Sequence, residues 1–138
     1  MTSPITPVED GLYNLLTAST ALIAALGGTA IYIRDVPVGT AAPYTILEVI
    51  RSADLNICPH RLREALIAVQ SISTTGAAQA ATLDGHCDTA LHNSTPTVTG
   101  WTSLHCWRQQ DMAYRESAPD GREYFHAGGQ YYLRYTQA

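Results

Sequence analysis

The sequence contains no lysine, and all eight of its basic residues are arginine. Charged residues make up only 14% of the 138 positions and the net charge is −4, so the broad positive field of nucleic-acid-binding proteins is missing and sequence-specific nucleic-acid binding is not expected. Arginine without lysine suits bidentate pairing at protein interfaces, although a bias in genome composition explains it equally well. Much of the polar surface must consist of Ser, Thr, Gln and Asn, or lie against a partner.

Cysteine is also scarce, and three residues form an odd number that does not suit a disulfide framework. The first four residues carry no basic region ahead of an apolar segment, so a secretion signal is not expected. The uncharged stretch from Leu15 to Ile33 is split by Gly27-Gly28 and diluted by Thr and Ser, which argues against a membrane span. The length suits one core, and we expect a single domain over residues 1–138.

The stretch from Arg63 to Asn93 is the one around which the predicted fold is organised. Both parities of Glu64–Ile72 carry apolar side chains, which is typical of a central strand covered on both faces. The polar turn Ser73–Gly76 then opens a helix. Its apolar positions recur at helical spacing: Ala80, Leu83, Cys87, and Ala90 or Leu91.

The N-terminal segment also reads as helical. Thr6 is a candidate N-cap, Pro7 suits the first helical position, and Glu9 is placed to complete a capping box. We expect helices over residues 7–17 and 19–26, either separate or continuous, ended by Gly27-Gly28.

The remaining segments alternate between strand and turn patterns. We expect strands over residues 30–33, 44–51, 97–107 and 123–136, and loops over 34–40, 52–62 and 108–122. Gly128-Gly129 inside the last strand indicates a bulge or a close backbone approach. The order α-β-β-β-α-β-β predicts an α+β fold, an antiparallel sheet of about five strands with two main helices packed on one face. The predicted core comprises Val8, Leu12, Leu15, Leu22, Leu26, Leu47, Val49, Ile67, Val69, Leu83, Cys87, Leu91, Leu104, Phe125 and Leu133.

Each cysteine has a histidine close by in the sequence, which raises the possibility of a zinc site. The pairs are Cys58 and His60, His86 and Cys87, and His105 and Cys106. Neighbours on a helix diverge by about 100° and neighbours on a strand point to opposite faces, so each adjacent pair offers at most one ligand. No activated nucleophile or phosphate-binding glycine loop is visible either. We therefore expect no metal, no cofactor and no enzymatic activity.

Aromatic residues on the last two strands stand out, because the helices of so small a domain cover only one sheet face. Large aromatics on an exposed strand face are a common mark of a protein interface, and the alternative is a covering loop from the same chain. The candidate interface residues on these strands are Trp101, Trp107, Tyr124, Tyr132 and Arg134. On the two longest loops and their borders the candidates are Arg61, Arg63, Arg108, Arg115 and Arg122.

The order and spacing of several segments resemble the tail-completion or tail-terminator proteins of long-tailed phages and gene transfer agents. The resemblance covers residues 8–136 and rests on apolar positions and turns. Its segments are Val8–Leu16, Ala21–Gly28 followed by Ile31-Tyr32, Pro43-Tyr44, the strand and helix of residues 63–93, and Tyr131–Tyr135.

The resemblance implies a non-enzymatic virion assembly protein without catalytic residues. Such a subunit forms a ring, typically a homohexamer. The ring caps the tail tube and joins it to the head-side connector or stopper protein, and it leaves an opening through which DNA can pass. The expected location is the tail or neck of the virion, assembled in the bacterial host cytoplasm. Two alternatives remain open: a head-side neck or stopper protein of the same particle, and a small α+β ligand- or metal-binding enzyme.

Overall fold

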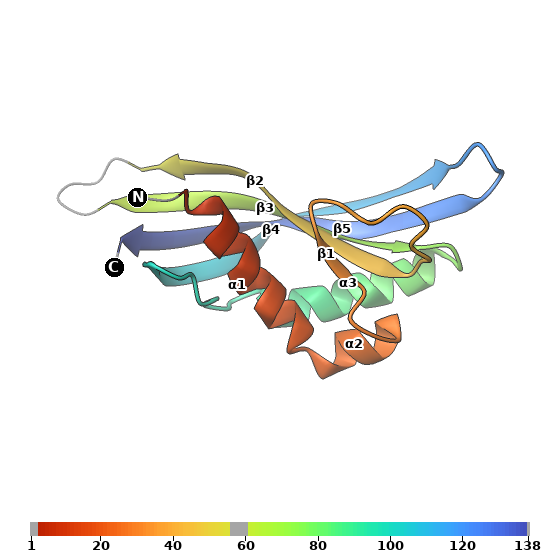
Figure 1. The fold of residues 1–138 in the computed structure, drawn as a ribbon, viewed down its shortest axis with the longest axis horizontal. Coiled ribbons are helices and arrows are strands. Elements are labelled where there is room, and N and C mark those ends of the chain that lie inside the picture. The colour runs from red at the N-terminus through yellow and green to blue at the C-terminus, as the bar shows by residue number, and fades with distance from the viewer. Residues whose placement is uncertain (1–2, 56–60, 138) are drawn as a thin grey trace.

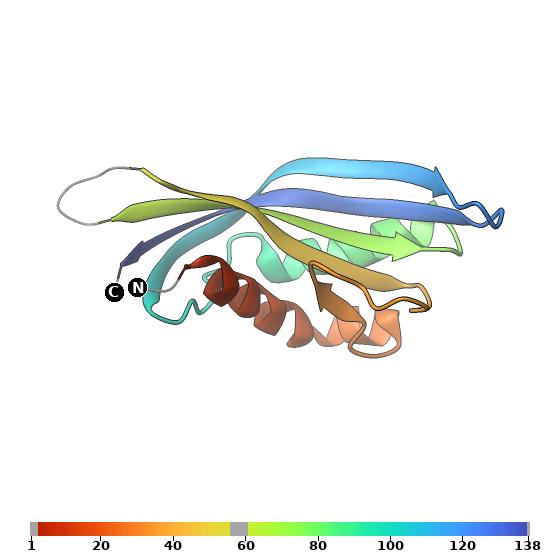
Figure 2. The ribbon, with the colours of Figure 1, turned by 45° about the horizontal axis from the view of Figure 1, so that its top comes forward.

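The computed structural model describes residues 3–55 and 61–137 and consists of a long twisted sheet with helices on one side (Figures 1 and 2). The elements in chain order are α1 (Ile5–Thr17), α2 (Thr20–Leu26), β1 (Ile31–Ile33), β2 (Tyr44–Asp54), β3 (Leu62–Ser73), α3 (Ala77–Leu91), β4 (Trp101–Ser117) and β5 (Glu123–Gln137). The strand order is β1-β2-β3-β5-β4, with β3 in the centre as predicted. The α+β class and the helices on one face are confirmed.

One strand pair departs from the predicted antiparallel sheet. β1 runs parallel to β2, with Ile31 opposite Thr45, whereas the other pairs are antiparallel. The segment of residues 34–43 returns the chain to the end at which β1 begins, so that β2 starts in the same direction (Figure 1). The sheet is therefore mixed.

The core lies between the sheet and the three helices. Val8, Leu12 and Leu16 of α1 follow at intervals of four residues and are fully buried. The predicted apolar stripe of α3 is confirmed, since Ala80, Leu83, Cys87 and Leu91 are all buried. Gly11 lets α1 approach the chain ahead of β4, because a Cβ there would collide with the backbone oxygen of Thr97.

Of the predicted core residues, Leu15 and Val49 are partly buried and packed against the core cluster, whereas Leu104 and Phe125 lie outside it. Leu104 is 48% exposed, and Phe125 is only half-buried. Leu104 is displaced because β4 carries an irregularity between Ser103 and His105, where one extra residue interrupts the pairing with β5. Such a bulge reverses which face the following side chains occupy.

The start of α1 differs from the prediction. The helix begins at Ile5 after Pro4, and no side chain caps it, so the capping box of Thr6 and Glu9 is wrong. Glu9 instead is 2% exposed and accepts two hydrogen bonds from Arg34, at 2.9 and 2.7 Å. Helix α2 is capped as an ordinary helix, with the Oγ of Ser19 accepting from the backbone N–H of Leu22.

Two predicted loops are partly strand. β4 continues through residues 108–117, paired with β5 as far as Ser117 opposite Glu123, so that only 118–122 form the turn. In the predicted loop 52–62, β2 reaches Asp54 and β3 starts at Leu62, while residues 56–60 lie outside the described residues. Both hairpins extend past the helical layer, where no core imposes an apolar pattern on them (Figure 2).

Candidate assembly surfaces

The helices leave the second face of the sheet uncovered (Figure 2), and aromatic side chains gather on it in two places. At one end Trp107 lies beside Tyr132, with ring centroids 5.6 Å apart, and stacks on His105 at 5.6 Å and 16°. The guanidinium of Arg134 lies 5.4 Å from the centre of a Trp107 ring and donates to Glu64 at 3.0 Å. We call these five residues the Trp107 cluster. Its stacked and ion-paired groups form a rigid, half-exposed surface of the kind found at interface centres.

A second group occupies the other half of the same face. Tyr114 stacks on His126, with centroids 4.2 Å apart, and both contact the side-chain oxygen of Gln70. Burial of Tyr44 raises the pKa of its hydroxyl, and the neighbouring half-buried Tyr124 raises it further. These five residues form the Tyr114 cluster. Sequence reasoning found only Tyr124 among them, because it assigned Tyr114 to a loop.

Trp101 does not belong to this face, contrary to the prediction. It packs edge-on against buried Tyr135, with centroids 5.1 Å apart and planes at 82°, as part of the helix-side core. The bulge between Ser103 and His105 places the side chains of Trp101 and Trp107 on opposite faces of the sheet, although both residue numbers are odd.

Arg108 is held inside the chain rather than presented to a partner. Its guanidinium donates to both carboxylate oxygens of Asp84, at 3.1 and 2.8 Å, and to Asp111 at 2.6 Å. It also donates to Tyr131 Oη at 3.0 Å and lies 3.6 Å from Asp88. Burial lowers the pKa of Arg108, but its hydrogen bonds to Asp84 and Asp111 outweigh this and raise it, so the guanidinium stays charged.

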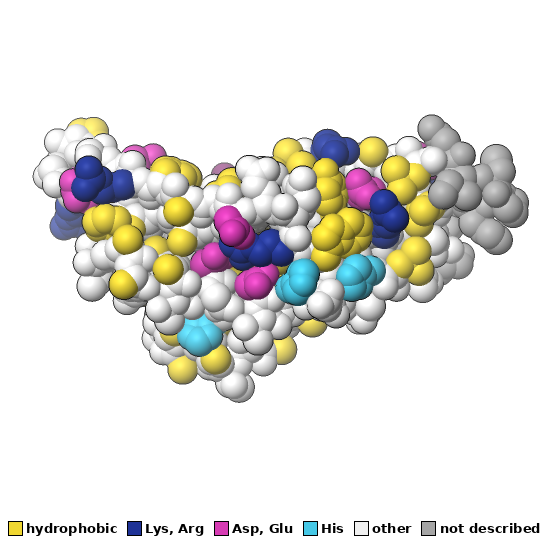
Figure 3. All heavy atoms as spheres, turned by 180° about the vertical axis from the view of Figure 1, so that it is seen from behind, with side chains coloured by type: hydrophobic (Ala, Val, Ile, Leu, Met, Phe, Trp, Pro, Cys, Tyr) yellow, Lys and Arg dark blue, Asp and Glu magenta, His cyan; other side chains and the backbone are white. Residues whose placement is uncertain are grey.

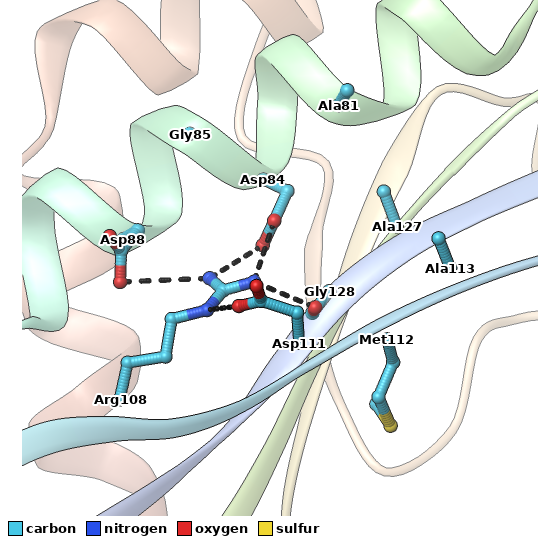
Figure 4. Close-up of a pocket in the computed structure, with 10 residues that line it drawn as sticks. All are labelled: Ala81, Asp84, Gly85, Asp88, Arg108, Asp111, Met112, Ala113, Ala127 and Gly128. Carbon is cyan, nitrogen blue, oxygen red and sulfur yellow. Dashed lines mark hydrogen bonds and ion pairs between the residues drawn. The ribbon is translucent and has the colours of Figure 1, made fainter.

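The surroundings of Arg108 form an open depression of about 450 Å³ between α3 and β4. Figure 4 shows Asp84 and Asp88 pointing at the guanidinium from α3 and Asp111 from β4. In Figure 3 a basic side chain ringed by acidic ones lies near the middle of the face. Gly129 makes room for this arrangement, because a Cβ there would lie 2.6 Å from Arg108 Cζ. The close approach predicted at Gly128-Gly129 is thereby confirmed: the approaching group is the Arg108 side chain at Gly129 and the backbone of Val69 at Gly128.

The other candidate arginines lie at the two ends of the sheet. Arg61 and Arg63 lie 2.8 and 3.7 Å from Asp54 near the end of the β2–β3 hairpin. These three residues place charge beyond the helical layer.

The opposite hairpin carries the last two candidates. Arg115 lies 3.8 Å from Glu123, and Arg122 lies 3.7 Å from Asp120 in the turn. Both arginines are more than half exposed, and such surface pairs contribute little stability. They remain available to contact a neighbour.

Polar groups close part of each edge of the sheet. The backbone N–H of Val49 donates to Glu9 at 3.1 Å just past the point where β1 ends. On β4 the backbone N–H of Arg108 donates to Nδ1 of His92 at 3.0 Å, and Cys106 bridges Ser94. These caps depend on contacts between distant segments, which local sequence patterns do not predict.

The cysteines that the structure describes are buried and unreactive. Burial raises the pKa of Cys87 to about 11 and that of Cys106 to about 12, so both remain thiols at neutral pH. Among the described residues, no three His, Cys, Asp or Glu side chains are arranged to hold a metal ion. The third predicted pair, Cys58 and His60, falls outside those residues.

Within the part of the chain that the structure describes, no helix is both long and apolar enough to cross a membrane.

A small α+β subunit with an uncovered aromatic sheet face and partly open sheet edges has the form of an assembly component. The sequence matches the family described as tail completion protein gp17 over residues 10–127, and the chain belongs to that family. It is therefore a structural protein of phage tails and not an enzyme. No curated protein matches the sequence.

The fold is shared with solved structures of low sequence identity. A chain from a structure titled "Virion of native gene transfer agent (GTA) particle" superposes with a TM-score of 0.76 at 19% identity, covering 92% of this chain and 94% of that one. A second solved chain gives a TM-score of 0.57 at 14% identity, covering 93% and 94%.

Proposed function

We propose that this chain is a tail terminator subunit that forms a homo-oligomeric ring, caps the tail tube and joins it to the head-side connector or stopper protein. The observation that carries the proposal is the uncovered sheet face with its two aromatic clusters, in a chain that belongs to the tail completion family. A hexamer is the expected stoichiometry. The likeness to a chain of a gene transfer agent virion supports a place in the particle, and we propose the tail or neck as its position and the host cytoplasm as the site of assembly.

The surfaces divide between the expected contacts. The Trp107 and Tyr114 clusters face neighbouring subunits, because rigid aromatics and Arg dominate interface energies. The turn between β4 and β5, with Arg115 and Arg122, projects beyond the helices and faces axial neighbours such as the tube or the connector (Figure 1). DNA passes through the ring without sequence-specific contacts.

The test is complementation of a particle that lacks this gene. Trp107→Ala and Tyr132→Asp should fold normally and lower the yield of joined particles, since losing a central aromatic costs about 2 kcal/mol or more of binding. Val38→Ala, which trims an exposed side chain in the loop before β2, is the matched control. Wild-type yield from both cluster variants, with a wild-type chain that stays monomeric on tubes, would refute the ring.

Tail length separates a terminator from a head-side neck protein. A cap ends growth of the tube, so its loss should give tails of irregular length. A neck protein acts after the tail is complete, so its loss should leave tails of normal length that do not join heads. Normal tails would favour the head-side alternative.

A further inference from the structure

The charged side chains are segregated along the molecule. We call the outer parts of β2 and β3 that the structure describes, with Arg61 and the adjoining part of β5, the basic end. Its charged residues are Arg51, Asp54, Arg61, Arg63, Glu64 and Arg134. They include four of the eight arginines and two of the twelve acids, which gives a net charge of +2, so that the rest of the chain carries −6.

The depression around Arg108 has the opposite charge. Three carboxylates, Asp84, Asp88 and Asp111, surround one guanidinium, which leaves a net charge of −2. Its remaining lining is made mostly of small residues, Ala81, Gly85, Ala113, Ala127 and Gly128. A long side chain from outside can therefore reach the acids.

The open parts of the two sheet edges lie at these same places. On β2 the pairing with β1 ends at Leu47 and Glu9 caps Val49, so among the described residues no strand lies beside Arg51–Asp54. On β4 the cap from His92 ends at Arg108, and no described strand lies beside residues 109–117. An unpaired edge invites pairing with another chain.

We infer that the basic end of one copy docks at the depression between α3 and β4 of the next copy, bringing Arg51 of the β2 edge toward Asp111 of the β4 edge. The occupant is a second copy of this chain, because both charge and edge are complementary within the same molecule. The inference rests on the proposed ring and adds a charged edge contact to the contacts proposed for the aromatic clusters.

The geometry of this contact suits a ring. It joins opposite edges of the sheet and unlike surfaces, so one contact repeats head to tail from copy to copy. The depression lies near the middle of the face (Figure 3), and a repeated contact of this kind gives a ring when the rotation between successive copies closes.

The test compares single charge reversals with their combination. Arg51 is exposed and Asp111 is 87% exposed, so Arg51→Glu and Asp111→Arg should both fold, as circular dichroism would check. Each should weaken self-association at least about tenfold, because like charges face each other in the contact. The double variant restores opposite charges and should recover most of the loss. Arg122→Glu, with the same charge change at the far hairpin, should have little effect.

Sedimentation at low and high salt measures the association, which should weaken as salt rises. If the wild type assembles but Arg51→Glu behaves like Arg122→Glu, or the double variant is no better than either single one, this contact is wrong while the ring stands. If the variants form normal rings that fail to bind tubes, the basic end faces the tube and the inference is overturned. A wild-type chain that never self-associates, in solution or on tubes, overturns both this contact and the proposed function.

Discussion

Replacing Arg108 by alanine is the sharpest test of how β4 is held against α3. The guanidinium makes five hydrogen bonds, to Asp84 (two), Asp111, Tyr131 and the backbone oxygen of Gly128, and its side chain is only 13% exposed. Its loss leaves the Asp84 carboxylate, 18% exposed, without its main partner. Removing one member of a buried ion pair costs about 3–5 kcal/mol, and partial exposure places this case near 3 kcal/mol.

The assay is urea unfolding followed by tryptophan fluorescence, with Arg122→Ala as the control. Arg122 lies 3.7 Å from Asp120 on the surface, so its loss should cost less than about 1 kcal/mol. The double variant Arg108→Ala/Asp84→Ala should be less destabilised than the sum of the single variants, because it removes the stranded carboxylate. An Arg108→Ala cost below about 1 kcal/mol would refute the structural role of this network.

Three further changes test other parts of the fold. Gly11→Ala should destabilise the protein by about 1–3 kcal/mol, because the new Cβ meets the backbone ahead of β4. Gly85→Ala in α3 meets nothing and should stabilise the protein by up to about 1 kcal/mol. Urea unfolding of the two variants checks both predictions. The free energy of unfolding should fall above pH 9, because the thiols ionise near pH 9.0 in the unfolded chain, while burial raises the pKa of Cys87 to about 11 and that of Cys106 to about 12 in the folded protein. Each thiol contributes a slope of up to about 1.4 kcal/mol per pH unit. Cys106→Ala should flatten this decline. Leu83→Ala in α3, fully buried in the core, should cost about 2–5 kcal/mol in the same unfolding assay, and a cost below about 1 kcal/mol would show that this helix does not pack as described.

Local periodicity accounts for the parts of the fold that the sequence predicted well. The central strand β3 and the buried stripe of α3 are predicted from patterns within a single segment. Apolar residues at successive positions indicate a strand inside the sheet, and apolar residues at helical spacing indicate one buried helix face. Helix signals within residues 7–17 predict α1 in the same way, although the helix begins at Ile5 and has no side-chain cap.

Long-range pairing accounts for the errors. Most of residues 108–117 are polar because β4 lies at the edge of the sheet and only its inner part, around Arg108 and Asp111, faces α3, so their own pattern resembles that of a loop. The bulge beside Ser103 moved Trp101 into the core and Leu104 out of it. Glu9 was assigned to a helix cap, although it binds Arg34, 25 residues away.

The sequence predicts an aromatic surface on the uncovered sheet face, but only some of its residues. Trp107, Tyr132 and Arg134 lie together on the uncovered face, as their alternation in the sequence indicated. Arg51 was overlooked because an irregularity between Val49 and Arg51 changes its face. Whether these residues contact a neighbour stays a prediction.

The two hairpins extend beyond the helices, so their length is independent of the packing that stabilises the core. Their outer strands are held by backbone pairing and carry little of the core, so they can change length without repacking the interior (Figure 2). Adding two residues to each strand of a hairpin moves its tip by about 7 Å and keeps every side chain on its original face. In the proposed ring, the distance that the β4–β5 hairpin spans to an axial neighbour can thus be adjusted in discrete steps of two residues per strand, while the folded centre of the subunit stays the same.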